Sequence, residues 1–149
     1  MKIHSFILFA AVLLLALETH GEDKGQEDVA KLTGTWACIS AVNDGKALAE
    51  GTAQKLRLTL TKDRGYKTER GKQVLFDSTY KIDPSKQPKH IDLIGTEGEN
   101  KGKTAQGIFV LEDDRLKICY TMPGKERPKE FESKPGSGAT LIIWKRLKQ

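Results

Sequence analysis

The stretch that decides the fold is KLRLTLTK, which runs from Lys55 to Lys62. Leucine occupies every second position from Leu56 to Leu60, and arginine or threonine stands between the leucines. Successive side chains of a β-strand point to opposite faces, so this alternation predicts a strand with one buried and one solvated face.

Similar patterns recur along the chain between clusters of turn-forming residues. They predict further strands over residues 32–42, 66–70, 74–82, 90–96, 106–111, 116–122 and 139–147. Most connections are short and contain Gly, Pro or Asp, which favour tight turns. About eight strands joined in this way predict an all-β fold. A meander of this kind suits an antiparallel up-and-down barrel, whose closure leaves no free sheet edge.

The first residues are typical of an export signal. Lys2 precedes an unbroken apolar run from Phe6 to Leu17, and a polar stretch follows. Twelve apolar residues are too few for a membrane span, which needs about 20. We therefore predict a signal peptide over residues 1–21, cleaved after Gly21, with cleavage after Ala16 or an uncleaved anchor as alternatives. Export would place the protein in the periplasm or outside the cell.

Removal of 21 of the 149 residues leaves 128, which suits one domain with a hydrophobic core. We expect a flexible lead-in over residues 22–30, with a short helical turn over residues 26–31 as the alternative, and a single monomeric barrel over residues 31–149. The net charge is +5, but acidic and basic residues are interspersed, as in Glu112 to Arg115. A nucleic-acid surface would cluster the cations, so we expect a solvated surface and no nucleic-acid partner. No later segment is apolar enough to span a bilayer.

Three stretches carry a family resemblance: LTGTWACISAVNDGK (32–46), YKIDPSKQPKHIDL (80–93) and LEDDRLKICYTMPGKERPKEFESKPGSGATLIIWKR (111–146). Together they resemble an uncharacterised secreted domain family of planctomycete bacteria, over nearly all of the mature chain. The resemblance implies an exported, single-domain β protein and implies no activity. His90 fills a position that is usually small and apolar in that pattern.

A looser resemblance is to lipocalin-like barrels, which have Gly-x-Trp on the first strand and a basic residue near the end of the last. Here these are Gly34-Thr35-Trp36 and Arg146. The resemblance implies that Arg146 lies over the Trp36 indole and closes one end of the barrel. A barrel of eight strands is filled by side chains or holds one small ligand. The inward positions expected to line such a cavity are Leu58, Phe76, Tyr80, Leu93, Ile118 and Tyr120.

Two cysteines, Cys38 and Cys119, stand about 80 residues apart. Alternation puts Cys119 on the face of Lys117, opposite Ile118, whereas Cys38 shares its face with the inward Trp36. A disulfide would need a bulge that brings the Cα atoms within about 7 Å. No base accompanies either thiol, so a structural cysteine is favoured over both a disulfide and a nucleophile.

The proline-broken stretch after residue 121 carries Arg127 and a lone aromatic, Phe131. Pro128 restrains Arg127 to an extended shape, and we predict that its guanidinium pairs bidentately with Asp92 and locks the loop over the barrel mouth. The alternative is that Arg127 and Lys129 bind an anionic ligand. Phe131 is expected to anchor the loop in the barrel end, with an exposed binding hot spot as the alternative.

Other candidate chemistry is weaker. Asp83 precedes a proline and is expected to cap a turn. His90 and Asp92 share a strand face, but two side chains do not make a metal site. The sequence contains no triad order, phosphate loop, zinc pattern or calcium loop, so we expect no cofactor. The predicted function is non-enzymatic binding of a small apolar ligand. The alternative is a filled barrel that interacts with a protein or envelope component, and a hydrolytic enzyme is the least supported.

Overall fold

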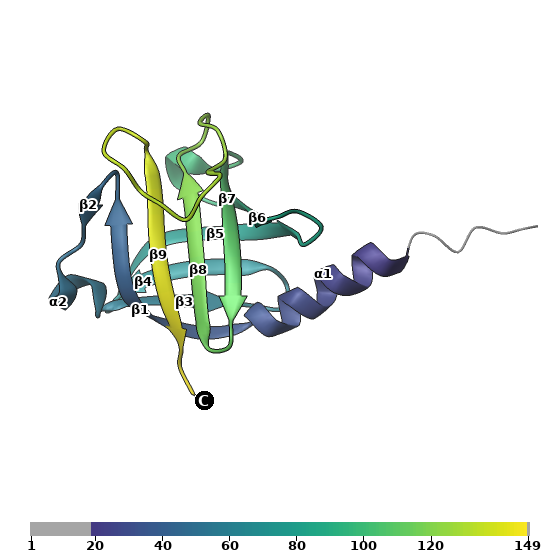
Figure 1. Cartoon of the computed structure of the whole chain (residues 1–149). Coiled ribbons are helices and arrows are strands. Elements are labelled where there is room, and N and C mark those ends of the chain that lie inside the picture. Colours follow the sequence, from purple (N-terminus) through teal and green to yellow (C-terminus); the bar gives the residue numbers. More distant parts are fainter. Residues whose placement is uncertain (1–18, 149) are drawn as a thin grey trace, which may run out of the picture.

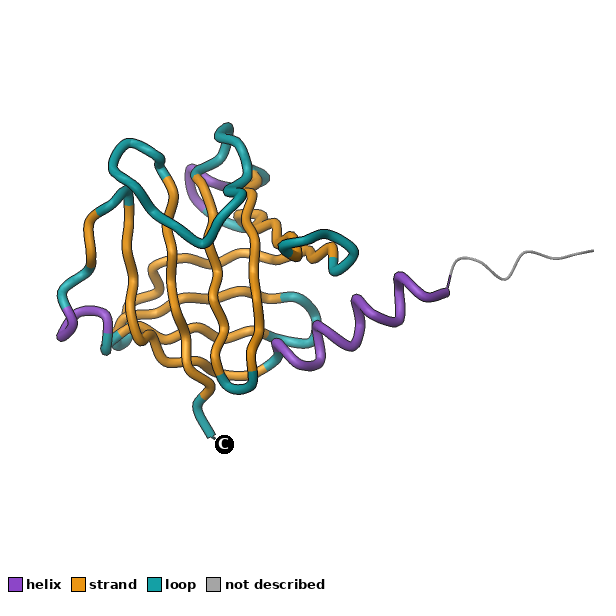
Figure 2. The backbone as a smooth tube through the Cα atoms, viewed as in Figure 1, coloured by secondary structure: helices purple, strands orange, loops and turns teal. Residues whose placement is uncertain are grey.

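The computed structural model describes residues 19–148, which form two α-helices, one short 3₁₀ helix and nine strands (Figures 1 and 2). The helical elements are α1 (Thr19–Leu32), α2 (Glu50–Ala53) and η1 (Gly98–Asn100). The strands are β1 (Gly34–Asn43), β2 (Lys46–Ala47), β3 (Leu56–Leu60), β4 (Gly65–Arg70), β5 (Gln73–Asp83), β6 (Lys89–Gly95), β7 (Thr104–Glu112), β8 (Arg115–Thr121) and β9 (Ala139–Arg146). The predicted signal peptide lies, up to residue 18, outside the described residues.

The strands close into a barrel. They form one antiparallel sheet in the order β2-β1-β3-β4-β5-β6-β7-β8-β9, and β9 pairs back onto β1. The two-residue β2 only extends the sheet beside β1, so the ring itself consists of eight strands. This confirms the predicted all-β, eight-stranded, up-and-down barrel.

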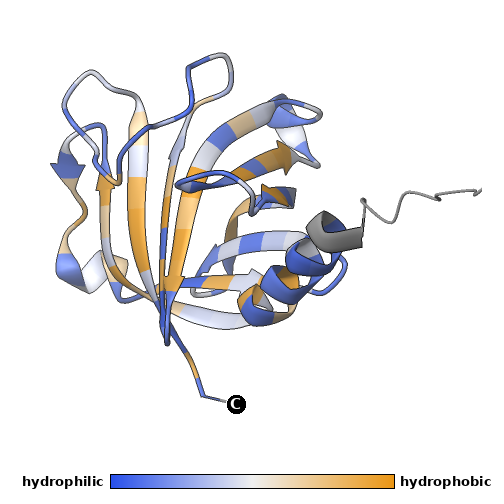
Figure 3. Ribbon diagram, turned by 45° about the vertical axis from the view of Figure 1, so that its right-hand side comes forward, coloured by the Kyte–Doolittle hydropathy of each residue, from blue (hydrophilic) through white to orange (hydrophobic). Residues whose placement is uncertain are grey.

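Alternation along the strands produces the core. In β3 the three leucines Leu56, Leu58 and Leu60 are buried, while Arg57 and Thr59 are partly exposed. Neighbouring strands show the same banding of apolar and polar residues in Figure 3. Each inward side chain therefore packs against inward side chains from across the ring, and the outward ones face water.

The segment expected to be a flexible lead-in, residues 22–30, is helical and belongs to α1. Most of this helix is hydrophilic and extends away from the barrel (Figures 1 and 3). Its last turn is different, because Val29 and Leu32 are 7% and 1% exposed and belong to the core. Burying two such side chains stabilises the contact by about 1.5–3 kcal/mol each. We call the end of the barrel that α1 covers the α1 end, and the opposite end the far end.

A stacked cation fixes the α1 end. Trp36 and Arg146 face each other in the ladder that closes the ring, and the guanidinium carbon lies 4.1 Å from the indole centroid. The same guanidinium donates hydrogen bonds to the carbonyls of Thr33 (3.0 Å) and Lys31, while the Trp36 Nε1 donates to the Leu32 carbonyl at 3.1 Å. A cation at the C-terminus of a helix also interacts favourably with its dipole.

Gly34 makes room for this arrangement. Its φ of 144° is rare for other residues, and a Cβ atom placed there would lie 3.0 Å from Arg146 Nη1. The Gly-x-Trp pattern therefore has a physical reason here, because the glycine admits the guanidinium that the tryptophan stacks against.

We predict that Arg146→Ala lowers the free energy of unfolding by about 2–4 kcal/mol, through loss of the cation–π contact and two charge-assisted hydrogen bonds. Arg146→Lys keeps the charge but lacks the planar fork, so it should recover less than half of the loss. Urea denaturation followed by tryptophan fluorescence measures both. Lys148→Ala, at an exposed neighbouring cation, is the matched control; an equal loss in the control would contradict the assigned role.

Candidate binding surfaces

The six residues expected to line a ligand cavity all come together inside the barrel. Leu58, Tyr80, Leu93 and Ile118 are at most 1% exposed, and Phe76 and Tyr120 are partly buried against the same cluster. They lie in one continuous core with both tryptophans. The sequence therefore located the interior correctly, and in the structure these side chains pack against one another.

Large side chains occupy this interior. Five aromatic residues there are at most 2% exposed: Trp36, Trp144, Tyr66, Tyr80 and Phe109. The Tyr66 ring packs edge-to-face against the ring of the partly buried Phe76, and the two ring centroids are 6.0 Å apart. Such pairs stabilise packing by about 0.5–1.5 kcal/mol beyond their buried area. Of the six expected cavity residues, only Phe76 lines one of the surface depressions described below.

The two cysteines are free and lie on opposite sides of the barrel wall. Cys38 faces the core, whereas Cys119 belongs to a second cluster on the outer face, which we call the outer cluster (Ile108, Cys119, Phe131, Ala139 and Leu141). Burial raises the pKa of the Cys38 thiol to about 11 and also raises the pKa of Cys119. Both thiols are therefore protonated at neutral pH and are poor nucleophiles.

The β8–β9 loop, residues 122–138, is held against the outer face by Arg127. Its Nη2 lies 2.8 Å from Asp92 Oδ1, and its Nη1 donates to the carbonyls of Gly107 (2.6 Å) and Ile91 (3.3 Å). The expected partner is present, but the pairing is a single contact rather than a bidentate one, because the other arm of the fork bonds to the backbone. With its acceptors supplied internally, Arg127 is poorly placed to bind an anion.

His90 lies near this contact, on the same strand as Asp92. Partial burial lowers the pKa of His90, and the positive charge of Arg127 lowers it further. The imidazole is therefore neutral at pH 7. Among residues 19–148 no group of three or more His, Cys, Asp or Glu side chains is placed to hold a metal ion.

The same loop covers the outer face rather than the barrel mouth, which corrects the expectation for both Arg127 and Phe131. Phe131 packs on the outer cluster, and the Cys119 thiol donates to the Glu132 carbonyl at 3.4 Å. The reason is strand parity, since Cys119 and Asp92 both point out of the barrel wall. A loop tied to outward residues lies along the wall.

The β1–β2 turn holds the other end of this loop. Gly45 N donates to Ser133 Oγ at 3.1 Å, and Ser133 Oγ donates to the Ala139 carbonyl at 2.7 Å. Gly45 has a φ of 79°, and a Cβ atom there would lie 2.4 Å from Pro135. The tight turn at Asp44-Gly45 therefore also supports the β8–β9 loop.

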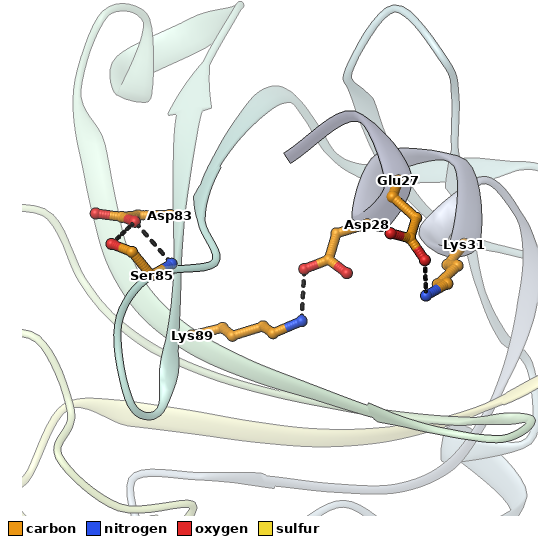
Figure 4. Close-up of polar contacts among 6 residues, drawn as sticks. All are labelled: Glu27, Asp28, Lys31, Asp83, Ser85 and Lys89. Carbon is orange, nitrogen blue, oxygen red and sulfur yellow. Dashed lines mark hydrogen bonds and ion pairs between the residues drawn. The ribbon is translucent and has the colours of Figure 1, made fainter. Parts of the chain in front are cut away.

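A cleft of about 930 Å³ lies between α1 and the β5–β6 connection, and its lining residues include Lys24, Arg64 and Asp83. Figure 4 shows the polar contacts around it. Lys89 spans the gap to Asp28 at 2.6 Å. Asp83 accepts hydrogen bonds from the Ser85 hydroxyl and backbone N, which lower its pKa and cap the turn. The Lys89–Asp28 ion pair joins α1 to the barrel beside the cleft, so we describe the cleft as the seam where α1 docks.

A smaller groove of about 340 Å³ lies at the far end and was not found from the sequence. One wall is the apolar run Val74-Leu75-Phe76 of β5; Asp77, Glu97, Gly98, Glu99 and Asn100 line the remainder. Val74 and Leu75 are 49% and 43% exposed. Three consecutive apolar residues break the alternation of a half-buried strand, and that break was the available signal.

Within residues 19–148, no helix is both long enough and apolar enough to cross a bilayer.

We predict that Arg127→Ala loosens the β8–β9 loop and exposes Cys119, which lies beneath it. Labelling of Cys119 by Ellman's reagent should accelerate about tenfold or more, which corresponds to at least 1.4 kcal/mol of lost local stability. Cys38, inside the barrel, should stay as slow as in the unmodified protein, and peptide mapping distinguishes the two sites. Lys129→Ala, an exposed cation of the same loop, is the control. If Cys119 of Arg127→Ala is labelled at an unchanged rate, the Arg127 contacts do not hold the loop in place.

Comparison of the chain with protein-family models, with curated proteins and with solved structures finds no match.

Proposed function

We propose that this protein is an exported, non-enzymatic interaction module, which binds a partner protein or envelope component with the far end of its barrel. The observation that carries the proposal is the filled interior. The core is continuous from Leu32 and Trp36 at the α1 end to Leu56 and Ala105 near the far end. A ligand carrier of this fold would instead keep space among those side chains.

Exposed apolar residues concentrate at the far end. Leu48, Val74, Leu75 and Met122 are 42–51% exposed, and they lie on β5 and on the β2–α2 and β8–β9 connections, all toward that end of the barrel. Scattered exposed leucines are ordinary on soluble proteins. Several toward one end favour a contact surface. The opposite end is already covered by α1.

The chemical groups that an enzyme would use are committed elsewhere. Both thiols are buried with raised pKa values, and Arg127 is held by Asp92 and two carbonyls. The small-ligand alternative requires Phe76 and Tyr120, the two partly buried members of the interior set, to move aside. It remains the second candidate because these two side chains are the least enclosed.

Native mass spectrometry of protein purified from its own host separates the two candidates. We expect the mass of the polypeptide alone, and no saturable energy transfer from Trp36 and Trp144 to added cis-parinaric acid, because both indoles are enclosed by protein. A Leu75→Ser variant controls for probe that adheres to the far-end surface. A stoichiometric apolar small molecule, or saturable transfer that persists in Leu75→Ser, would overturn the proposal in favour of a carrier.

A further inference from the structure

The strand β5 is longer than the strand beside it. It runs from Gln73 to Asp83, but β6 pairs only with its second half, from Ser78 onward. Beyond that point the chain leaves the sheet, and Thr96 makes the last contact by donating to the Asp77 carbonyl from its N (3.4 Å) and Oγ1 (3.1 Å). Within the described part of the chain, the segment 73–76 therefore pairs with β4 on one side only.

Such a free strand edge is a template for an additional strand. The open edge is about four residues long, or roughly 13 Å at 3.3 Å per residue. The register between β4 and β5 shifts beside Leu75, which leaves this residue without a paired neighbour. A bulge usually discourages extended pairing between sheet edges. Here it limits the edge to a short segment, and Val74 and Leu75 are both left exposed.

The groove along this edge is acidic. Asp77, Glu97 and Glu99 are exposed and line it, and no lysine or arginine does. Lys67 faces Asp77 across the β4–β5 ladder but forms its ion pair with Glu69, at 3.2 Å. Among the residues described, none of the three groove carboxylates has an ion-pair partner within 4 Å. The groove thus combines a hydrogen-bonding edge, an apolar wall and unneutralised negative charge.

We infer that the 73–76 edge of β5 receives a short extended segment of a partner protein that alternates lysine or arginine with apolar residues. The segment adds as a strand beside β5, its apolar side chains contact Val74 and Leu75, and its cations face Glu97 and Glu99. This inference rests on the proposed function and specifies the chemistry of the partner. The cleft beside α1 is a poorer fit, because the charged residues that line it are mixed in sign.

The test uses the folded protein and three acetylated, amidated hexapeptides: alternating Val and Lys, the same peptide with Glu for Lys, and the Val–Lys peptide with alternate backbone N atoms methylated. We expect the Val–Lys peptide to bind and to shift the amide resonances of residues 73–77 and 97–100. The Glu peptide should not bind, and N-methylation should weaken binding at least tenfold, because it blocks strand hydrogen bonds.

The double variant Glu97→Gln, Glu99→Gln should bind the Val–Lys peptide about 5- to 10-fold more weakly than the unmodified protein does. Its affinity should also depend less on salt, as expected for the loss of two exposed charge contacts. Glu130→Gln, an exposed carboxylate on the β8–β9 loop, is the matched control and should have no effect. Equal affinity for the N-methylated peptide, or resonance shifts confined to the α1 cleft, would overturn the strand-addition inference and leave the interaction module intact. Concentration-dependent dimerisation that blocks the peptide would assign the edge to a second copy of this chain and also overturn it. A co-purifying small molecule in the interior would instead remove the proposed function itself.

Discussion

The stacking of the Arg146 guanidinium on the Trp36 indole is the contact on which the rest of the structure depends. The two residues are register partners in the ladder between the first and last strands of the ring, so they meet only when the barrel is closed. The same cation bonds the carbonyls of Lys31 and Thr33 where α1 ends. Ring closure, helix docking and coverage of one end of the core thus depend on a single network of contacts, and the proposed binding surface lies at the other end.

Much of this could be predicted from local patterns. The alternation of apolar and polar residues, clearest in Leu56, Leu58 and Leu60, correctly predicted most strands, because a half-buried strand requires that spacing. Strand parity also separated Cys38 from Cys119, and the expected partner of Arg127, Asp92, does pair with it. Parity alone did not show that a loop tied to outward residues must run along the wall, and the loop was expected over the mouth.

What the sequence did not reveal depends on contacts between distant segments. The helix α1 has few apolar residues, and its last turn is held by Val29 and Leu32 packing on a core assembled from later strands. The far-end groove exists because β6 ends at Gly95, opposite Ser78, and so leaves the first residues of β5 without a strand on that side. Neither the helix nor the groove is encoded by a periodic pattern in its own segment.

The seam between β1 and β9 also has a consequence for how the barrel forms. Every other ladder of the ring joins strands that follow one another along the chain or are separated only by β2 and α2, whereas Trp36 and Arg146 are 110 positions apart. The entropy of closing a loop grows with its length, and contacts of long range form slowly. The seam is accordingly the costliest pairing to nucleate. At its far-end edge, the Asp44 carboxylate accepts a hydrogen bond from Gly138 N (2.9 Å), which holds the two strands in register once they meet.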